Sequence, residues 1–282
     1  MFKIVKKRQL NSSVVLLEIE APFVAKKAQP GQFIIFRTDE HGERVPLTIA
    51  DFDREKGTVT IIVQTVGRAT KLLGSMNEGD SIRDFVGPLG VPTHFGDVKR
   101  VAVIGGGVGC AIAYPQAKAL HGKGVHVDMI AGFRSKEIVI LEEEMKAVSD
   151  NLIITTDDGS YGKHGFVTNA LQELIDAGNQ YDLVVAIGPI PMMKFVCQVT
   201  KPYNIKTMVS LNPIMIDGTG MCGCCRVHVG GETKFACVDG PDFDGHQVDF
   251  EELMRRNANY REMEQEENEH ICRLTGGVRT NA

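Results

Sequence analysis

The sequence has no tryptophan, and aromatic residues make up only 6% of its 282 residues. It contains no run of about 18 apolar residues, the minimum for a helix that crosses a membrane. A basic segment opens the chain, but the apolar stretch that follows, residues 14–17, is too short for the core of a signal peptide. We therefore expect a cytoplasmic protein without a membrane partner.

The chain also lacks an excess of basic residues. Its formal net charge is −5, with 31 lysines and arginines against 36 aspartates and glutamates. This balance argues against a nucleic-acid partner, which would need a basic face. Hydrophobic residues make up 43% and charged residues 24%, a composition typical of globular proteins. At about 100–200 residues per domain, the length predicts about two domains.

The seven cysteines do not show the even spacing of a secreted disulfide scaffold. Three of them are scattered along the chain, namely Cys110, Cys197 and Cys272. The other four form a tight cluster, namely Cys222, Cys224, Cys225 and Cys237. A cluster of this kind in a cytosolic chain indicates a metal site rather than disulfide bonds.

Residues 1–98 are predicted to form a β-rich domain. Short segments rich in β-branched residues alternate with turn signals such as Pro30-Gly31 and Lys56-Gly57. The expected strands cover residues 14–19, 32–36 and 58–63, with one short helix at 70–73. Several short strands at this spacing are typical of an antiparallel β-barrel.

The pattern changes near residue 98, and residues 99–205 alternate between apolar strands and helices. The expected strands cover residues 100–104, 125–131, 152–155 and 183–187. One expected helix follows the glycines at 105–109 and ends near residue 121. The other expected helices cover residues 141–148, 167–177 and 191–200. This alternation predicts a nucleotide-binding domain built on a parallel α/β sheet.

Beyond residue 205 the periodicity is lost. Residues 206–250 are rich in glycine and cysteine and are predicted to form a small cluster-binding lobe. Residues 251–282 form a charged C-terminal segment, with a polar helix expected over 251–272. That helix can dock on a partner or remain a solvated surface helix.

The clustered cysteines follow the ladder Asp217-x4-Cys222-x2-Cys225-x11-Cys237. Plant-type [2Fe–2S] sites use Cys-x4-Cys-x2-Cys with a more distant fourth cysteine. The spacing is therefore kept here, while aspartate takes the first position. Thiolates are soft ligands suited to iron–sulfur clusters, and neighbouring glycines let backbone N–H groups approach the sulfides. The ladder predicts a [2Fe–2S] cluster with these four residues as its ligands.

Other interpretations of the same residues stay open. The cysteines can bind zinc together with Asp217 or a histidine, act as small buried apolar side chains, or form a redox Cys-x-x-Cys pair. Asp217 precedes a glycine and can be a plain turn residue. Cys224 lies between two expected ligands, and we expect it to point away.

A glycine-rich turn at residues 105–109 follows an expected strand and opens an expected helix. In such a turn the backbone can approach a pyrophosphate, and the helix N-terminus favours its negative charge. The alternative is a tight strand–helix turn without a ligand. The residues expected to bind a dinucleotide here are Gly106, Gly107, Val108 and Gly109.

Further residues follow the carboxyl ends of later strands, where α/β sheets bind ligands. They are Arg134, Asp157, Asp158, Gly188, Pro189 and Met192. Aspartates that accept hydrogen bonds from ribose hydroxyls favour NAD(H), whereas Arg134 and Lys136 can meet the 2′-phosphate of NADP(H). We take NAD(H) as the first choice; for the charged residues, a solvated loop is the alternative.

The motifs occur in a recognisable order. They are Arg44-Val45-Pro46-Leu47-Thr48-Ile49, the glycine turn, Gly188-Pro189 with Met192-Met193, and the cysteine ladder. This set resembles the ferredoxin–NADP reductase superfamily, and more narrowly the electron-transfer subunits of dihydroorotate dehydrogenase B. The stretch from Asp217 to Cys225, with Phe235-Ala-Cys-Val-Asp-Gly-Pro, is most similar to the small subunits of NADH-dependent reduced ferredoxin:NADP oxidoreductases. The resemblance covers residues 1 to about 250.

The resemblance implies FAD in the barrel. It implies that Thr48 is the catalytic residue, hydrogen-bonding near the reactive flavin nitrogen; without the resemblance Thr48 is an ordinary strand threonine. The superfamily motif is Arg-x-Tyr-Ser/Thr, whereas Arg44 stands four residues before Thr48 and no tyrosine intervenes. The full set implied to bind FAD is Arg44, Pro46, Leu47, Thr48 and Ile49, followed by Gly67, Arg68, Ala69 and Thr70.

The resemblance further implies that hydride passes from NADH to FAD, and that single electrons leave through the cluster. The expected partner is a larger flavin/iron–sulfur subunit, in a heterodimer or higher assembly that couples NADH, NADPH and ferredoxin by electron bifurcation. One alternative is the electron-transfer subunit of dihydroorotate dehydrogenase B. Others are a stand-alone NAD(P)H:acceptor reductase and a zinc-stabilised nucleotide-binding module without redox activity.

Overall fold

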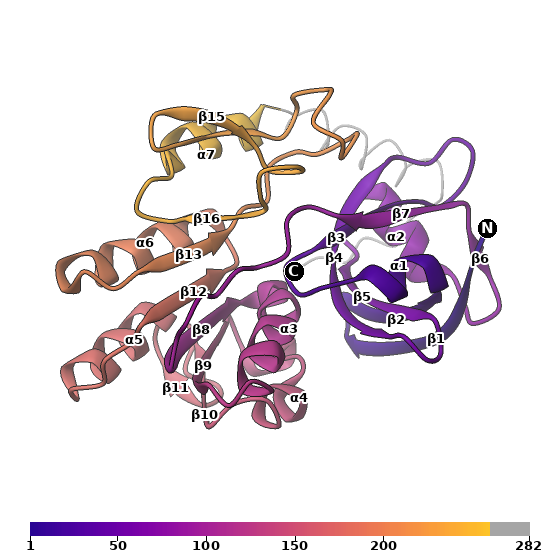
Figure 1. Cartoon of the computed structure of the whole chain (residues 1–282). Coiled ribbons are helices and arrows are strands. Elements are labelled where there is room, and N and C mark those ends of the chain that lie inside the picture. Colours follow the sequence, from indigo (N-terminus) through magenta and orange to yellow (C-terminus); the bar gives the residue numbers. More distant parts are fainter. Residues whose placement is uncertain (260–282) are drawn as a thin grey trace.

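The structure is a computed structural model of the chain, and it describes residues 1–259. The amino-terminal part is one antiparallel sheet that curls into a nearly closed barrel, with the strand order β6-β1-β2-β5-β4-β3-β7 (Figure 1). This confirms the predicted antiparallel barrel. Its strands are β1 (Phe2–Asn11), β2 (Val14–Glu20), β3 (Phe33–Arg37), β4 (Val45–Asp53), β5 (Thr58–Gln64), β6 (Ser81–Ile82) and β7 (Asp84–Leu89). Its helices are α1 (Pro22–Lys27) and α2 (Arg68–Ser75).

The second sheet has the order β11-β10-β9-β8-β12-β13-β16 and is parallel except for its last strand. This confirms the predicted α/β domain. Its strands are β8 (Arg100–Gly106), β9 (His126–Phe133), β10 (Asn151–Thr156), β11 (Lys163–His164), β12 (Leu183–Ile187), β13 (Thr207–Ser210) and β16 (Asp242–Asp244). Its helices are α3 (Cys110–His121), α4 (Glu142–Lys146), α5 (Val167–Asp176) and α6 (Ile190–Thr200). Short 3₁₀ turns are η1 (Gly107–Gly109), η2 (Lys136–Ile138) and η3 (Lys201–Tyr203).

Helices cover both faces of this second sheet, so its central strands read as continuous apolar runs. Along β8, Ala102 and Ile104 pack in the core that contains α5 and α6. Val101 and Val103 point to the opposite core, which contains α3. Successive strand residues face opposite sides of a sheet, which produces this division.

Strand β2 joins the barrel to the second domain by the same alternation. Val15 and Leu17 fill the barrel interior. Leu16, between them, points outward and belongs to the core that contains Cys110 and Ala111 of α3. The outer face of the barrel therefore packs directly against the helix that follows the glycine turn.

Residues 206–250 are not fully separate from the α/β domain, because two of their strands belong to the second sheet. Strand β13 pairs in parallel with β12, and β16 returns antiparallel to β13. Between them the chain forms a hairpin of β14 (Arg226–Val229) and β15 (Glu232–Phe235). Strands of three or four residues carry too little periodicity to be recognised in a glycine-rich sequence.

The helix predicted over residues 251–272 begins as α7 (Phe250–Ala258). Asp249 caps it by accepting a hydrogen bond from the backbone N–H of Glu252 at 2.9 Å. Phe250 and Leu253 are buried on its inner face. The part of this prediction from residue 260 onward, and with it Cys272, lies outside the described residues.

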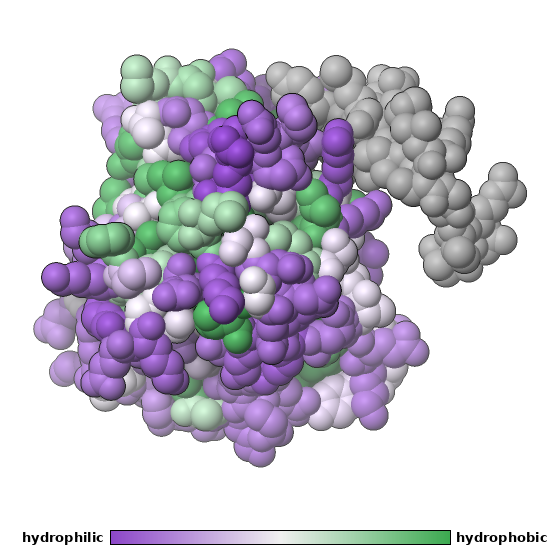
Figure 2. Space-filling model, turned by 90° about the vertical axis from the view of Figure 1, so that its right-hand side faces the viewer, coloured by the Kyte–Doolittle hydropathy of each residue, from purple (hydrophilic) through white to green (hydrophobic). Residues whose placement is uncertain are grey.

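The surface on the barrel side is hydrophilic over most of its lower half, with small separate apolar patches above (Figure 2). Within residues 1–259, we find no helix that is both long enough and apolar enough to cross a membrane.

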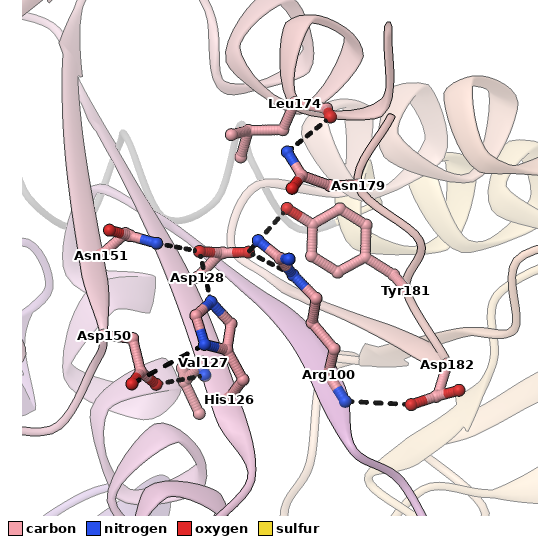
Figure 3. A network of polar contacts seen from close by, with 10 residues as sticks. All are labelled: Arg100, His126, Val127, Asp128, Asp150, Asn151, Leu174, Asn179, Tyr181 and Asp182. Carbon is pink, nitrogen blue, oxygen red and sulfur yellow. Dashed lines mark hydrogen bonds and ion pairs between the residues drawn. The ribbon is translucent and has the colours of Figure 1, made fainter. Parts of the chain in front are cut away.

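A polar network joins the amino-terminal ends of neighbouring strands in the second sheet (Figure 3). At its centre the Asp128 side chain, 1% exposed, accepts two hydrogen bonds from the Arg100 guanidinium at 2.8 and 3.0 Å. Tyr181 donates to the same carboxylate at 2.8 Å and Asn151 at 2.6 Å, and His126 lies 3.2 Å away. Burial opposes the charge, but the bonds from Asn151, Arg100 and Tyr181 hold the pKa of Asp128 below its ordinary value.

Replacing Asp128 with Asn should reduce the free energy of unfolding by about 3 kcal/mol, because it leaves the Arg100 charge without its buried partner. Urea unfolding of the purified protein measures the change. Glu137→Gln, at an exposed position, is the control and should stay within about 0.5 kcal/mol of the wild type. Equal stabilities of Asp128→Asn and wild type would contradict this account of the network.

The same carboxylate predicts a dependence of stability on pH. Because its folded-state pKa lies below the ordinary value of about 3.9, its contribution is fully present above that value. The contribution is lost as the pH falls through the folded-state pKa. The stability difference between wild type and Asp128→Asn should therefore shrink below about pH 4, which urea unfolding at a series of pH values tests.

Candidate functional site

The glycine-rich turn lies at the carboxyl end of β8. The chain passes through η1 and enters α3 at Cys110. Gly107 has φ +55°, and a Cβ placed there would meet nothing within 4 Å. The turn therefore presents open backbone at the start of a helix, where N–H groups attract phosphate.

The structure brings the segment that begins at Gly188 against this turn. A Cβ at Gly106 would lie 2.4 Å from the Met192 sulfur and 3.0 Å from Pro189 Cδ. A Cβ at Gly109 would lie 2.4 Å from the carbonyl oxygen of Ile187. Only glycine permits these close approaches, so the two predicted dinucleotide segments form one continuous surface.

The acidic and basic candidates meet at the same edge of the sheet. The backbone N–H of Asp157 donates to Phe133 at 3.0 Å, and that of Asp158 donates to Arg134 at 3.2 Å. The Asp158 carboxylate accepts bonds from the hydroxyl and N–H of Ser160, which lower its pKa. Asp158 thus stabilises its own loop, whereas the exposed Asp157 side chain makes no hydrogen bond or ion pair with the residues described, 1–259.

The predicted flavin segments lie on the barrel. In the β3–β4 ladder, Thr48 is paired with Phe33 and Pro46 with Ile35. Val45 to Thr48 are partly exposed, whereas the Ile49 side chain is buried in the barrel core. Val45 and Leu47 also pack against that core, so Pro46 and Thr48 are the side chains of this predicted segment that lie on the opposite face.

The second flavin segment forms the start of α2. Gly67 precedes the helix, and Arg68, Ala69 and Thr70 form its first turn. The backbone N–H of Gly67 donates to the Thr70 hydroxyl at 3.0 Å. The Ala69 side chain is buried in the barrel core, which anchors the turn. Backbone N–H groups at the start of a helix attract phosphate.

The β14–β15 hairpin explains the eleven-residue spacing between the last two cysteines. Arg226 and Phe235 are paired at its base, so Cys225 and Cys237 leave the two strands side by side. Both are buried, at 1% and 2% exposure. Burial, with the neighbouring Cys225 thiol, raises the pKa of Cys237 to about 12 when no metal is present.

Backbone N–H groups point at two of the sulfurs. Gly220 donates to Cys237 Sγ at 3.1 Å. The backbone of Cys224 donates to Cys222, which lowers the pKa of that exposed thiol, while the nearby Asp217 charge acts in the opposite direction. The Asp217 carboxylate accepts from the N–H of Thr219 at 3.1 Å and also from its hydroxyl. The four predicted ligands thus gather in one loop and the base of one hairpin.

In the part of the chain that the structure describes, no three His, Cys, Asp or Glu side chains are arranged to hold a single metal ion. A [2Fe–2S] cluster distributes its ligands over two irons and is tuned by hydrogen bonds to its sulfurs. Three thiols, one carboxylate and two N–H···S contacts fit that group. If bound here, it would be held by Asp217, Cys222, Cys225 and Cys237.

Sequence patterns did not reveal what Arg44 contacts. Its Nε donates to the carbonyl oxygen of Ile216 at 2.9 Å, and its Nη2 to that of Asp217 at 3.2 Å. This residue of the predicted flavin motif is therefore bonded to the loop of the predicted cluster. A contact across 172 residues leaves no local signal in the sequence.

A protein-family model agrees with the geometry of this loop. Residues 212–249 match the iron–sulfur cluster binding domain of dihydroorotate dehydrogenase B. A Thermotoga maritima protein described as a homologue of the dihydroorotate dehydrogenase B (NAD(+)) electron transfer subunit is 46% identical over 274 residues. The alignment covers 97% of this chain and 96% of that protein. The chain belongs to this electron-transfer subunit family.

Two solved structures are similar to this chain along most of its length. One, from work on flavin-based electron bifurcation by the NADH-dependent reduced ferredoxin-NADP oxidoreductase, has a TM-score of 0.91 and 45% identity. The match covers 96% of this chain and 98% of that chain. The ferredoxin reductase of carbazole 1,9a-dioxygenase has a TM-score of 0.60, 17% identity, and coverage of 72% and 65%. That second likeness shows the ferredoxin-reductase fold, as expected from the sequence.

Replacing Gly109 with Ala should destabilise the protein by about 1–3 kcal/mol, because the new Cβ would overlap a backbone carbonyl that cannot move alone. Thermal unfolding measures the effect. Gly67→Ala is the matched control, since a Cβ there meets nothing closer than 3.9 Å. If both variants unfold at the wild-type temperature, the turn is not held as tightly as described.

Proposed function

We propose that the chain is the electron-transfer subunit of a flavin- and iron–sulfur-containing oxidoreductase that exchanges electrons with NAD(H). FAD binds at the partly exposed residues of β4 and the start of α2. The dinucleotide binds at the glycine turn, and a [2Fe–2S] cluster binds between Asp217 and Cys237. FAD supplies the conversion between two-electron and one-electron chemistry.

One observation carries this proposal. The loop that holds the predicted cluster ligands is bonded through Arg44 to the strand that carries the predicted flavin segment. The other side of the barrel packs on α3, which begins at the dinucleotide turn. Three predicted redox sites therefore surround one barrel, as an internal electron relay requires.

The chain's own residues define the roles at the dinucleotide edge. Gly107 leaves open backbone for a pyrophosphate, Gly106 and Gly109 let the segment that begins at Gly188 pack against the turn, and the start of α3 supplies positive backbone potential. Asp157 is exposed at the end of β10, in position to accept from ribose hydroxyls. Arg134 and Lys136 are the two cations that could bind a 2′-phosphate. The Lys136 ammonium instead lies over the Tyr161 ring, 5.3 Å from its centre. This favours NAD(H), with NADP(H) as the second choice.

The rim of the cluster loop offers a surface for a partner. Ile216, Met221 and Val238 are exposed at 48%, 89% and 43%, although their side chains are apolar. Apolar side chains gathered around an exposed predicted ligand are typical of a protein–protein contact. The proposed occupant is a larger flavin/iron–sulfur catalytic subunit in a cytoplasmic heterodimer or larger assembly.

Two reactions are compatible with such a partner. The likeness to the bifurcating oxidoreductase, at 45% identity along nearly the whole of both chains, supports transhydrogenation among NADH, NADPH and ferredoxin. The match of the cluster loop to the dihydroorotate dehydrogenase B domain supports dihydroorotate oxidation as the second candidate. In both, this chain relays electrons and the partner holds the second substrate site.

Purification without oxygen should yield a yellow-brown protein with one FAD, two irons and two acid-labile sulfides per chain. Cys225→Ser and Cys237→Ser should lose most of the iron and keep the FAD, because each removes a buried thiolate ligand. Cys224→Ser is the matched control in the same loop and should keep both groups. Iron and sulfide analysis with flavin absorbance measures all three variants. One zinc without flavin in the wild type would overturn the proposal.

A further inference from the structure

The Arg44 side chain crosses from the barrel to the loop that holds the predicted cluster ligands. Its guanidinium donates through two different nitrogens to two successive carbonyl oxygens, those of Ile216 and Asp217. A guanidinium presents its donors in a rigid planar fork, so two bonds fix both the position and the orientation of the acceptors. Hydrogen bonds from a charged donor are also stronger than neutral ones.

A second contact holds the same loop on the barrel. Gly218, with φ +85°, lies so close that a Cβ would be 2.6 Å from Ile35 and 2.9 Å from Leu89. Ile35 belongs to β3 and is paired with Pro46 of the predicted flavin segment. The loop therefore rests on β3, and Arg44, one residue before the neighbouring strand β4, donates to its carbonyls.

The lobe as a whole does not depend on these contacts. The backbone N–H of Val91 donates to the carbonyl of Gly240 at 2.7 Å. Thr93 and Gln116 both donate to the Asp242 carboxylate. Strands β13 and β16 are also part of the second sheet. Loss of the Arg44 bonds should therefore release the ligand loop locally without detaching the lobe.

We propose that Arg44 is a positioning residue that fixes the cluster loop against the flavin-bearing strand and places a permanent positive charge beside the cluster. This assignment rests on the proposed function. Arg44, which precedes the predicted flavin segment, is thereby assigned to the loop of the predicted cluster. Its departure from the Arg-x-Tyr-Ser/Thr spacing agrees with that different task.

Two consequences follow from the geometry. Without the bonds, the backbone around Asp217 should open more often, because hydrogen bonds from a charged donor are lost. Without the charge, the cluster should become harder to reduce, because net charge and hydrogen bonding near an iron–sulfur cluster set its potential. Arg44→Gln removes both the charge and the fork, whereas Arg44→Lys keeps the charge alone.

Hydrogen exchange followed by mass spectrometry of the full-length protein tests the first consequence. In Arg44→Gln, amides of residues 214–223 should exchange about tenfold faster, with those of the barrel unchanged. Arg54→Gln is the matched control, because Arg54 also donates to two backbone carbonyls, those of Lys26 and Ala28, within the same barrel. It should leave residues 214–223 at the wild-type rate.

Redox titration followed by electron paramagnetic resonance tests the second consequence on protein that contains iron. The cluster potential should shift to a more negative value in Arg44→Gln and stay near that of wild type in Arg44→Lys and Arg54→Gln. Unchanged exchange and unchanged potential in Arg44→Gln would overturn the proposal, as would equal effects of Arg54→Gln on the loop. A wild type without iron would instead defeat the proposed function, while the exchange experiment would still test the loop contact.

Discussion

The packing of the barrel against α3 is the constraint on which the remaining arrangement depends. Leu16, Ala50 and Ile62 of the barrel share one core with Cys110 and Ala111 at the start of the helix. Outside this core, Lys118 of α3 lies 2.7 Å from the Asp51 carboxylate of β4. Because burial of apolar surface is the main favourable term in association, this contact holds the two domains in one orientation. The glycine turn at residues 105–109 is thereby fixed relative to the barrel.

Much of the fold could be predicted because its longer elements carry strong local signals. The apolar run at residues 100–104 and the β-branched run at 58–63 became β8 and β5, each extended by one or two residues. The glycine turn could be recognised because a strand and a helix flank it. The cysteine ladder could be recognised because ligand spacing is local in the sequence.

The remainder could not be predicted because it depends on contacts between distant residues. Strands β13 and β16 are defined by their neighbours in the sheet and not by periodicity of their own. The buried Asp128 gains Arg100, Tyr181 and Asn151 as partners from three other segments of the chain, 23 to 53 residues away. The bonds from Arg44 and the approach of Gly218 to Ile35 likewise appear only once the barrel and the lobe are assembled.

The β14–β15 hairpin limits how the chain between Cys225 and Cys237 can change in length. Its two strands turn through Gly230 and Gly231, which both have positive φ, while Arg226 and Phe235 are paired at the base. Lengthening both strands by one residue at the tip would leave the two thiols where they are. A single residue added within one strand would shift the pairing and turn side chains to the wrong face. Length changes that keep the two thiols in place are therefore paired additions to both strands, or additions to the turn at Gly230 and Gly231, where the pairing ends.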